Sequence, residues 1–376
     1  MAAPDGIFLA RPAAIGNGTR LAVKDLLDTE GLVTTYGSAI FVDHVPKQTA
    51  ESVRRLEAAG YVNVGKTNLH EFAYGITSEN PHFGTVPNPL APGRIAGGSS
   101  GGSAAALAAG LADAALGTDS GGSIRIPAAC CGVVGFKPTY DLVPTDGCFP
   151  LAPSFDTVGP MATSVDECET MLGLLAPEFR PLALDTLDEL QVGIEPLDAA
   201  EPLVAASVTK AAAHFRHRRD VRVVELLSEV RGRVSDLFQR EVADVHGELF
   251  VEHRDLYGDD VATKIEECLD VPFGALDSGR EARETYRTSC LETIEGLELV
   301  VSPTVPCVAQ PVGIGDLALR RRFIHYTFPF NVLGWPALAL PCGPAEDGLP
   351  ASIQLAGRPG ADALVLAAGK RLASLL

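Results

Sequence analysis

The spacing of apolar and polar residues in the first third of the chain predicts short strands and helices in alternation. Residues 49–59 carry apolar side chains at helical spacing and end at Gly60, which predicts an amphipathic helix. Residues 61–64 follow as a strand, and residues 68–74 are expected to begin another helix. Because strands and helices follow one another, the pattern favours an α/β fold.

The alternation continues through a segment rich in glycine. A helix is predicted at 104–111, a short apolar segment at 114–117, a loop at 118–122 and a helix from about Ser123. Eleven of the 38 glycines lie between residues 93 and 135. Glycine costs backbone entropy, so this density indicates positive φ angles or a close approach of the backbone to a ligand.

The second half of the chain changes character and then returns to sheet-like sequence. Charged amphipathic helices dominate residues 177–296, which we interpret as a helical cap or insertion within a single domain of residues 1–376. The clearest of these helices are at 234–252 and 281–293. Strands are then predicted at 297–302, 337–341 and 351–355, with a final helix near 361–375. One sheet with strands from both ends of the chain is expected.

The composition is that of a folded, acidic protein. Hydrophobic residues make up 46% of the chain, and 30 Lys and Arg against 48 Asp and Glu give a net charge of −18. This charge disfavours nucleic acid as a partner, and the basic run at 214–219 is interpreted as a solvated helix end. We expect a cytoplasmic protein, because the first residues lack a signal-peptide pattern and no stretch approaches 18 uninterrupted apolar residues.

The cysteines do not indicate a metal or dithiol centre. None of the eight forms a C-x-x-C pair, so free, buried thiols in a reducing compartment are expected. No metal site is predicted.

Two short motifs point to other chemistries. Residues 60–67 match the P-loop pattern G-x-x-x-x-G-K-[ST], but the four middle residues are expected to form a strand and not a phosphate-binding loop. Residues 98–102 contain G-x-S-x-G, the nucleophile elbow of α/β-hydrolases, which would make Ser100 the nucleophile. That mechanism needs a downstream histidine, and none of the candidates, His246, His253 and His325, lies in a distinctive loop.

Lys66, Ser99 and Ser123 form a more consistent set, because each lies in a turn marked by glycine. A serine hydroxyl needs a base to become a nucleophile. A lysine that burial keeps neutral can be that base, and a second serine can pass the proton between the two. Ser120, Gly121 and Gly122 lead into a helix N-terminus, where converging N–H groups can stabilise an oxyanion.

Residues 97–140, beginning GGSSGGSAAALAAG and continuing through GTDSGGSIRIP, resemble the amidase signature family. The likeness extends to segments before and after this stretch, whereas about 177–296 is unmatched. The further similar segments are LAVKDLLDTEG (21–31), VNVGKTNLHEFAYG (62–75), ENPHFGTVPNP (79–89), SFDTVGPMA (154–162), LVVSPTVP (299–306), FPFNVLGWPALALPCG (328–343) and GLPASIQLAGRP (348–359).

The resemblance implies a hydrolase with a Ser–cisSer–Lys triad. Ser123 would be the acyl-forming nucleophile, Ser99 the bridging serine after a cis peptide from Gly98, and Lys66 the base, so that the rate falls as Lys66 protonates at low pH. The backbone of Ser120, Gly121 and Gly122 would form the oxyanion hole. Side chains supporting the site would be Ser100, Asp119 and Arg125. The family likeness also implies an α/β/α sandwich around one large mixed sheet, often a homodimer, and a reaction without metal or organic cofactor.

The expected function is hydrolysis of a small carboxylic amide, with ester, carbamate or anilide cleavage also compatible. The alternative is an A-type glutamine amidohydrolase subunit of an amidotransferase complex, although the Gln typical three residues after the nucleophile is Ile126 here. A catalytically silent scaffold would require a lost triad. An apolar Ile126 suggests an uncharged or apolar acyl group, and the candidate pocket residues are Ile126, Phe149 and Tyr326.

Overall fold

A large mixed β-sheet runs through the structure, a computed structural model that describes residues 6–376. Within these residues the sheet has 11 strands, in the order β1-β3-β2-β6-β8-β7-β12-β13-β11-β9-β10. Strands β4 (Glu79–Asn80) and β5 (Gly84–Thr85) form a separate pair. The bounds of the sheet strands are β1 Phe8–Ala10, β2 Thr19–Lys24, β3 Tyr61–Thr67, β6 Ala114–Thr118, β7 Val134–Lys137, β8 Val158–Ala162, β9 Gln191–Ile194, β10 His217–Asp220, β11 Leu299–Pro303, β12 Ala337–Pro344 and β13 Pro350–Gly357.

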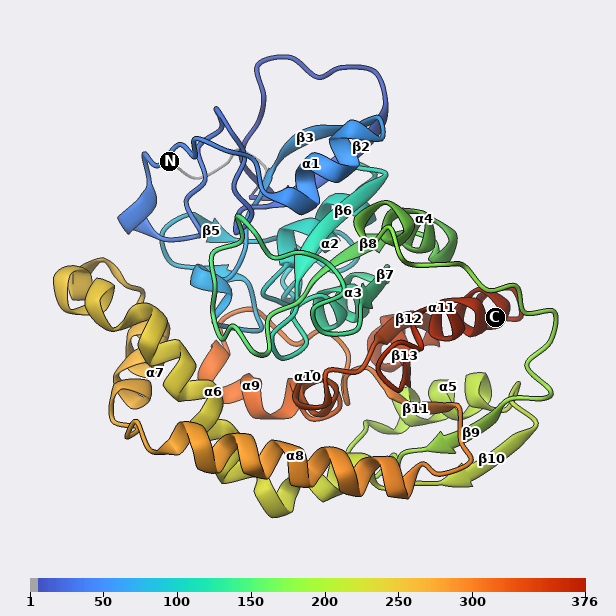
Figure 1. Cartoon of the computed structure of the whole chain (residues 1–376). Helices are drawn as coiled ribbons and strands as arrows, with labels where there is room; N and C mark the ends of the chain where they lie inside the picture. The colour runs from blue at the N-terminus through green and yellow to red at the C-terminus, as the bar shows by residue number, and fades with distance from the viewer. Residues whose placement is uncertain (1–5) are drawn as a thin grey trace.

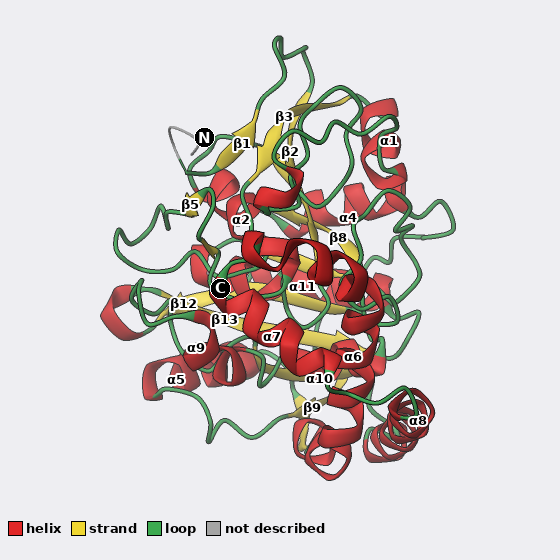
Figure 2. Ribbon diagram, turned by 90° about the vertical axis from the view of Figure 1, so that its left-hand side faces the viewer, coloured by secondary structure: helices red, strands yellow, loops and turns green. Residues whose placement is uncertain are grey.

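Helices lie on both faces of the sheet (Figures 1 and 2). The α-helices are α1 Glu51–Ala58, α2 Gly101–Ala108, α3 Arg125–Cys131, α4 Val165–Leu175, α5 Pro202–Ala212, α6 Val223–His253, α7 Asp259–Leu269, α8 Ala275–Thr293, α9 Asp316–Phe323, α10 Phe328–Leu333 and α11 Asp362–Ala373. Short 3-10 helices are η1 Ala39–Phe41, η2 Glu71–Ala73, η3 Arg254–Leu256 and η4 Glu346–Gly348.

Alternating side chains of β2 show how the two faces are built. Leu21 and Val23 belong to the core that includes α1, α4 and α11, whereas Ala22 belongs to the core that includes α2. Successive side chains of a strand point to opposite faces, so both faces of this strand are buried. The predicted arrangement of helices around one mixed sheet is therefore confirmed.

A third core joins the long helices to the sheet. Residues of α6, α7, α8 and α10 pack together with Val300 of β11, Ala337 of β12 and Ala356 of β13. In Figure 1 the helices α6, α7 and α8, coloured yellow to orange, lie along one side of the molecule.

Most predicted elements are present, with boundaries that differ by a few residues, except that α6 begins at Val223 instead of 234 and α8 at Ala275 instead of 281. The helix expected at 68–74 is wrong, because the chain there forms the 3-10 turn η2 with positive φ at Phe72 (50°) and Ala73 (58°). Such angles cannot continue an α-helix. In the P-loop-like segment 60–67, Gly60 lies in a turn and residues 61–67 form β3, so the middle residues are a strand, as expected.

The segment 177–296 contains helices α5 to α8 together with two strands that the sequence did not predict. Strands β9 and β10 lie within it and extend the main sheet, so the expected helical cap or insertion also contributes strands to the sheet. The basic run at 214–219 leads into β10, whose four residues, His217–Asp220, are all exposed. Charged residues on an edge strand hinder pairing with other chains, which explains a polar strand at this position.

Two further expectations concern the cysteines and the membrane. All eight cysteines are free, and all except the half-buried Cys148 are buried, as predicted. Among residues 6–376, no helix combines the length and apolar character that crossing a bilayer requires.

Candidate active site

Lys24, at the end of β2, is hydrogen bonded to Ser99. Its Nζ donates to the Ser99 Oγ at 2.7 Å and to Thr118 Oγ1, at the end of the neighbouring strand β6, at 2.7 Å. Lys24 and Ser99 are both fully buried. Burial, only partly offset by nearby acidic groups, lowers the pKa of Lys24 to about 7. Lys24 is therefore a buried amine that is largely neutral just above neutral pH.

Lys66 does not contact Ser99, and the expected contact between these residues is wrong. Its Nζ donates to the Leu27 carbonyl and to Thr34 Oγ1 at 2.8 Å, and lies 3.4 Å from Asp25 Oδ1. The register of the parallel pair β2–β3 explains this, because Lys66 is paired with Val23 while Lys24 is paired with Thr67. Lys66 therefore points to the face opposite Lys24 and Ser99.

Ser99 and Ser123 come from two loops that a backbone hydrogen bond joins. The Gly98–Ser99 peptide is cis, which confirms that prediction. The next residue, Ser100, donates its N–H to the Ser123 carbonyl at 3.1 Å. Ser123 is 6% exposed and lines a cavity, and no hydrogen-bond partner for its hydroxyl occurs among the described residues. Its hydroxyl is thus available to a substrate.

The loop before Ser123 offers backbone donors, but not every one that was predicted. Gly122 donates its N–H to Asp119 Oδ1 at 2.8 Å, so this amide is already used. Within residues 6–376, the amides of Ser120, Gly121 and Ser123 have no hydrogen-bond acceptor. These amides, and not Gly122, are the free donors beside the cavity. Gly122 has φ of +129°, and an added Cβ would lie 2.3 Å from Thr327 Oγ1, so the loop needs glycine there.

Asp119 and Arg125 form a fully buried ion pair that holds the loop to α3. The Arg125 Nη2 lies 2.8 Å from Asp119 Oδ1, and the guanidinium also donates to Gln354, Asn331 and the Thr327 carbonyl. Although burial alone would raise it, the charge and hydrogen bonds of Arg125 hold the pKa of Asp119 well below its usual value. The predicted supporting residues therefore fix the backbone that carries Ser123.

Substituting Arg125 by methionine is expected to lower the free energy of unfolding by about 3–5 kcal/mol, because the Asp119 carboxylate stays buried without its partner. Urea unfolding measures this effect. The control is Arg54→Met, which removes an exposed ion pair with Glu51 and should cost about 1 kcal/mol or less. Equal effects of the two substitutions would contradict a structural role of the buried pair.

The Ser100 hydroxyl is hydrogen bonded to the protein backbone, and Ser100 does not line the cavity. Its Oγ donates to the Thr118 carbonyl and accepts from the Thr118 N–H, both at 3.3 Å. The histidine His246 is buried in α6, where its ring is bonded to the Tyr257 hydroxyl at 3.0 Å. No contact joins Ser100 to a histidine in residues 6–376, which disfavours a nucleophile elbow in this segment.

A cavity of about 500 Å³ opens beside Ser123. Ser120 and Gly121 form one wall with the segment 73–76, and the other walls come from α6, α7 and the region 317–328. The volume is in the range of small-molecule sites. Residues of α6 and α7, within the segment 177–296, and of α9 line it. The remaining lining residues are Leu151, Arg231, Ser235, Phe238, Gln239, Lys264, Glu267, Leu317, Arg320, Arg321, Ile324 and Phe328.

The three candidate pocket residues, Ile126, Phe149 and Tyr326, do not line this cavity. Ile126 is fully buried in the core, because every residue of the short helix α3 is enclosed. Phe149 packs in an aromatic cluster with Tyr36, 4.6 Å between ring centroids. Tyr326 is buried, and its hydroxyl donates to the Pro196 carbonyl at 2.9 Å. Ile126 therefore gives no support for an apolar acyl group.

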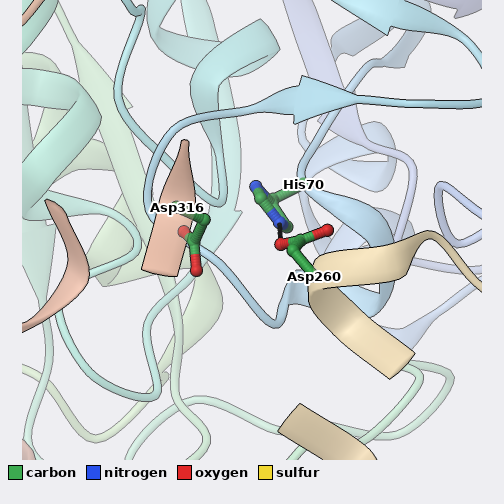
Figure 3. A group of neighbouring side chains, drawn as sticks. All are labelled: His70, Asp260 and Asp316. Atoms are coloured by element: carbon green, nitrogen blue, oxygen red, sulfur yellow. Dashed lines mark hydrogen bonds and ion pairs between the residues drawn. The ribbon is translucent and has the colours of Figure 1, made fainter. Parts of the chain in front are cut away.

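A cluster of one histidine and two aspartates beside the cavity stabilises the wall at 73–76. His70, Asp260 and Asp316 lie within reach of a common ion (Figure 3). The Lys264 Nζ already bonds to Asp260 at 3.0 Å and to Asp316 at 2.8 Å, and it donates to the Tyr74 carbonyl. Asp316 in turn accepts the Ile76 N–H at 2.6 Å. The ammonium group supplies the positive charge here, and the cluster is an internal salt bridge.

The arrangement of these residues suits nucleophilic chemistry on a carbonyl. It joins a free serine hydroxyl, unpaired backbone donors and a buried lysine whose proton affinity is low. The residue that the sequence reasoning missed is Lys24. It is the last residue of β2 and lies in the segment LAVKDLLDTEG, and this position was its only signal.

Comparison with known proteins agrees with this geometry. The sequence profile of the family described as Amidase matches residues 14–366. The A-type subunit of the glutamyl-tRNA(Gln) amidotransferase from Haloarcula marismortui is 35% identical, over 95% of this chain and 95% of that protein.

Solved structures are similar over nearly the whole fold. A crystal structure of an amidase is 37% identical, with a TM-score of 0.87 over 95% of this chain and 84% of that one. A 6-aminohexanoate cyclic dimer hydrolase complexed with substrate is 25% identical, with a TM-score of 0.83 over 98% and 89%. The chain therefore belongs to the amidase signature family and is a hydrolase acting on carbon–nitrogen bonds.

Proposed function

We propose that this protein hydrolyses a small carboxylic amide through an acyl-Ser123 intermediate, with Ser99 and Lys24 as the proton relay. The observation that carries the proposal is the buried hydrogen bond between Lys24 and Ser99, beside a cavity that Ser123 lines. Because the pKa of Lys24 is lowered to about 7, its amine is largely neutral above this pH. It can then accept, through Ser99, the proton that the Ser123 nucleophile must lose. Lys24 takes the role first expected of Lys66.

The reaction has two steps, acylation and then deacylation of Ser123, and both use the same proton relay. Ser123 attacks the amide carbonyl while its proton passes to Ser99, and the Ser99 proton passes to Lys24. The oxyanion accepts hydrogen bonds from free amides of the loop 120–123. The tetrahedral intermediate then breaks its C–N bond, and the relay returns a proton to the leaving ammonia or amine. Water, deprotonated through the same relay, hydrolyses the ester and regenerates Ser123.

The relay predicts a defined pH dependence. Lys24 accepts a proton only when neutral, and burial lowers its pKa to about 7. We expect kcat/KM to be level above this pH and to fall about tenfold per pH unit below it. A pH–rate profile measures this. A value of kcat/KM that stays constant down to pH 5 would contradict the role of Lys24.

A glutamine amidohydrolase subunit is the second candidate, favoured by the names of relatives such as the Haloarcula marismortui protein. It predicts activity that is specific for glutamine and depends on partner subunits. The stand-alone proposal predicts turnover by the purified chain alone.

A panel of substrates separates the two candidates. Release of ammonia or amine is measured with small amides, anilides, carbamates, esters and glutamine, using enzyme inactivated with a fluorophosphonate as the blank. Hydrolysis of simple amides by the chain alone supports the proposal. Activity that is confined to glutamine and appears only with partner subunits would overturn it.

A further inference from the structure

The cavity beside Ser123 is lined by more cations than anions, although the chain as a whole has a net charge of −18. Arg231 reaches it from α6, Lys264 from α7, and Arg320 and Arg321 from α9. Among the described residues that line the cavity, the one carboxylate is Glu267, which is exposed on α7. A local excess of positive charge in an acidic protein needs a reason.

Two of these cations have partners within the protein. Lys264 is held by Asp260 and Asp316. The Arg320 guanidinium lies over the Tyr74 ring, 4.7 Å from its centroid. Lys264 and Arg320 therefore stabilise the wall of the cavity.

Arg231 and Arg321 are different. Neither forms an ion pair or a side-chain hydrogen bond within residues 6–376, although Arg231 is half-buried. Burial, and then the charge of Arg321, lower the pKa of Arg231, so the two guanidinium groups repel each other. Placing an unpaired guanidinium beside another costs stability, and a bound anion removes that cost.

We propose that the substrate is a small amide that carries a carboxylate, and that Arg231 and Arg321 bind this carboxylate while the amide lies at Ser123. This inference rests on the proposed function and names its substrate class. Guanidinium groups match the planar carboxylate with paired hydrogen bonds. The volume of about 500 Å³ accommodates such a molecule between the arginines and Ser123.

Matched substrate pairs test the proposal. Glutaric acid monoamide is compared with pentanamide, which places the carboxylate on the acyl side. N-acetyl-β-alanine is compared with N-propylacetamide, which places it on the amine side. In at least one pair, kcat/KM is expected to be about 10- to 100-fold higher for the substrate that carries the carboxylate. Hydrogen bonds to a charged group contribute binding free energy of this size.

Substitutions test whether the two arginines cause the preference for the substrate with a carboxylate. In the double variant Arg231→Gln, Arg321→Gln the ratio within the preferred pair should fall to about 1–3. Arg322→Gln is the matched control, because Arg322 adjoins Arg321 but pairs outside the cavity with Glu201 at 2.8 Å. It should keep the wild-type ratio. Ratios near 1 in both wild-type pairs, or a ratio that survives in the double variant, would overturn the inference.

Binding measurements keep the inference separate from catalysis. Calorimetry with the Ser123→Ala variant should show glutaric acid monoamide or N-acetyl-β-alanine binding at least about tenfold more tightly than its neutral counterpart. If the wild type hydrolyses no amide, the proposed function fails while this binding difference still decides the inference. Equal binding of charged and neutral members would reject it.

Discussion

Replacing Ser123 by alanine is expected to abolish amide hydrolysis, with kcat lowered by about 10⁶-fold. The hydroxyl is the proposed nucleophile, and no other group in the cavity takes its place. The substitution should not disturb the fold, because among described residues the Ser123 hydroxyl has no partner to lose. The measurement is ammonia release from the best substrate of the panel at saturating concentration, with folding checked by urea unfolding.

Ser100→Ala is the matched control for this prediction. Ser100 is the neighbouring serine of the alternative nucleophile elbow, and its hydroxyl bonds only to the Thr118 backbone among the described residues. Its loss should lower kcat by about tenfold or less, through small shifts of the loop. Inactive Ser100→Ala with active Ser123→Ala would reverse the assignment.

Replacing Lys24 by methionine is expected to lower kcat by about 10²- to 10⁴-fold, the contribution typical of a general base. Methionine keeps the apolar stem in its buried site but accepts no proton, and Ser99 loses the partner that its hydroxyl has at 2.7 Å. The same variant should lose the fall in rate near pH 7. The measurements are single-turnover rates and the pH profile of kcat/KM.

Lys66→Met provides the contrast. Lys66 is also fully buried, but it balances the charge of Asp25 on the other face of the sheet. Its loss should lower the free energy of unfolding by about 3–5 kcal/mol. The folded fraction should keep the pH profile of the wild type. A flattened profile in Lys66→Met, with a normal profile in Lys24→Met, would make Lys66 the base.

The sequence was informative where local patterns determine the chemistry. Ser99, the cis peptide before it and the glycine-rich loop before Ser123 lie in one continuous signature, and the family resemblance of this signature was enough to place them. The choice between Lys24 and Lys66 did not follow. Both lysines occupy strands near their C-terminal ends, and only the register of β2 against β3 decides which face each side chain reaches.

The cavity shows a second limit of sequence reasoning. Arg231 and Arg321 are 90 positions apart, and they share a cavity only because the fold brings α6 and α9 to it. Ile126 lies three residues from Ser123 but is turned into the core by α3. Proximity in sequence therefore suggested the wrong lining residue, while the charged residues in separate helices carried no readable motif.

The nucleophilic reactivity of Ser123, promoted by Lys24, can be observed without knowledge of the natural substrate, because a fluorophosphonate phosphonylates an activated serine and expels fluoride. The experiment is mass spectrometry of the protein after brief reaction with a fluorophosphonate, with the labelled peptide sequenced. We expect one label on Ser123, formed at a rate that falls below about pH 7 and is lowered at least 100-fold in Lys24→Met. A label on Ser99 or Ser100, or an unchanged labelling rate in Lys24→Met, would contradict this mechanism.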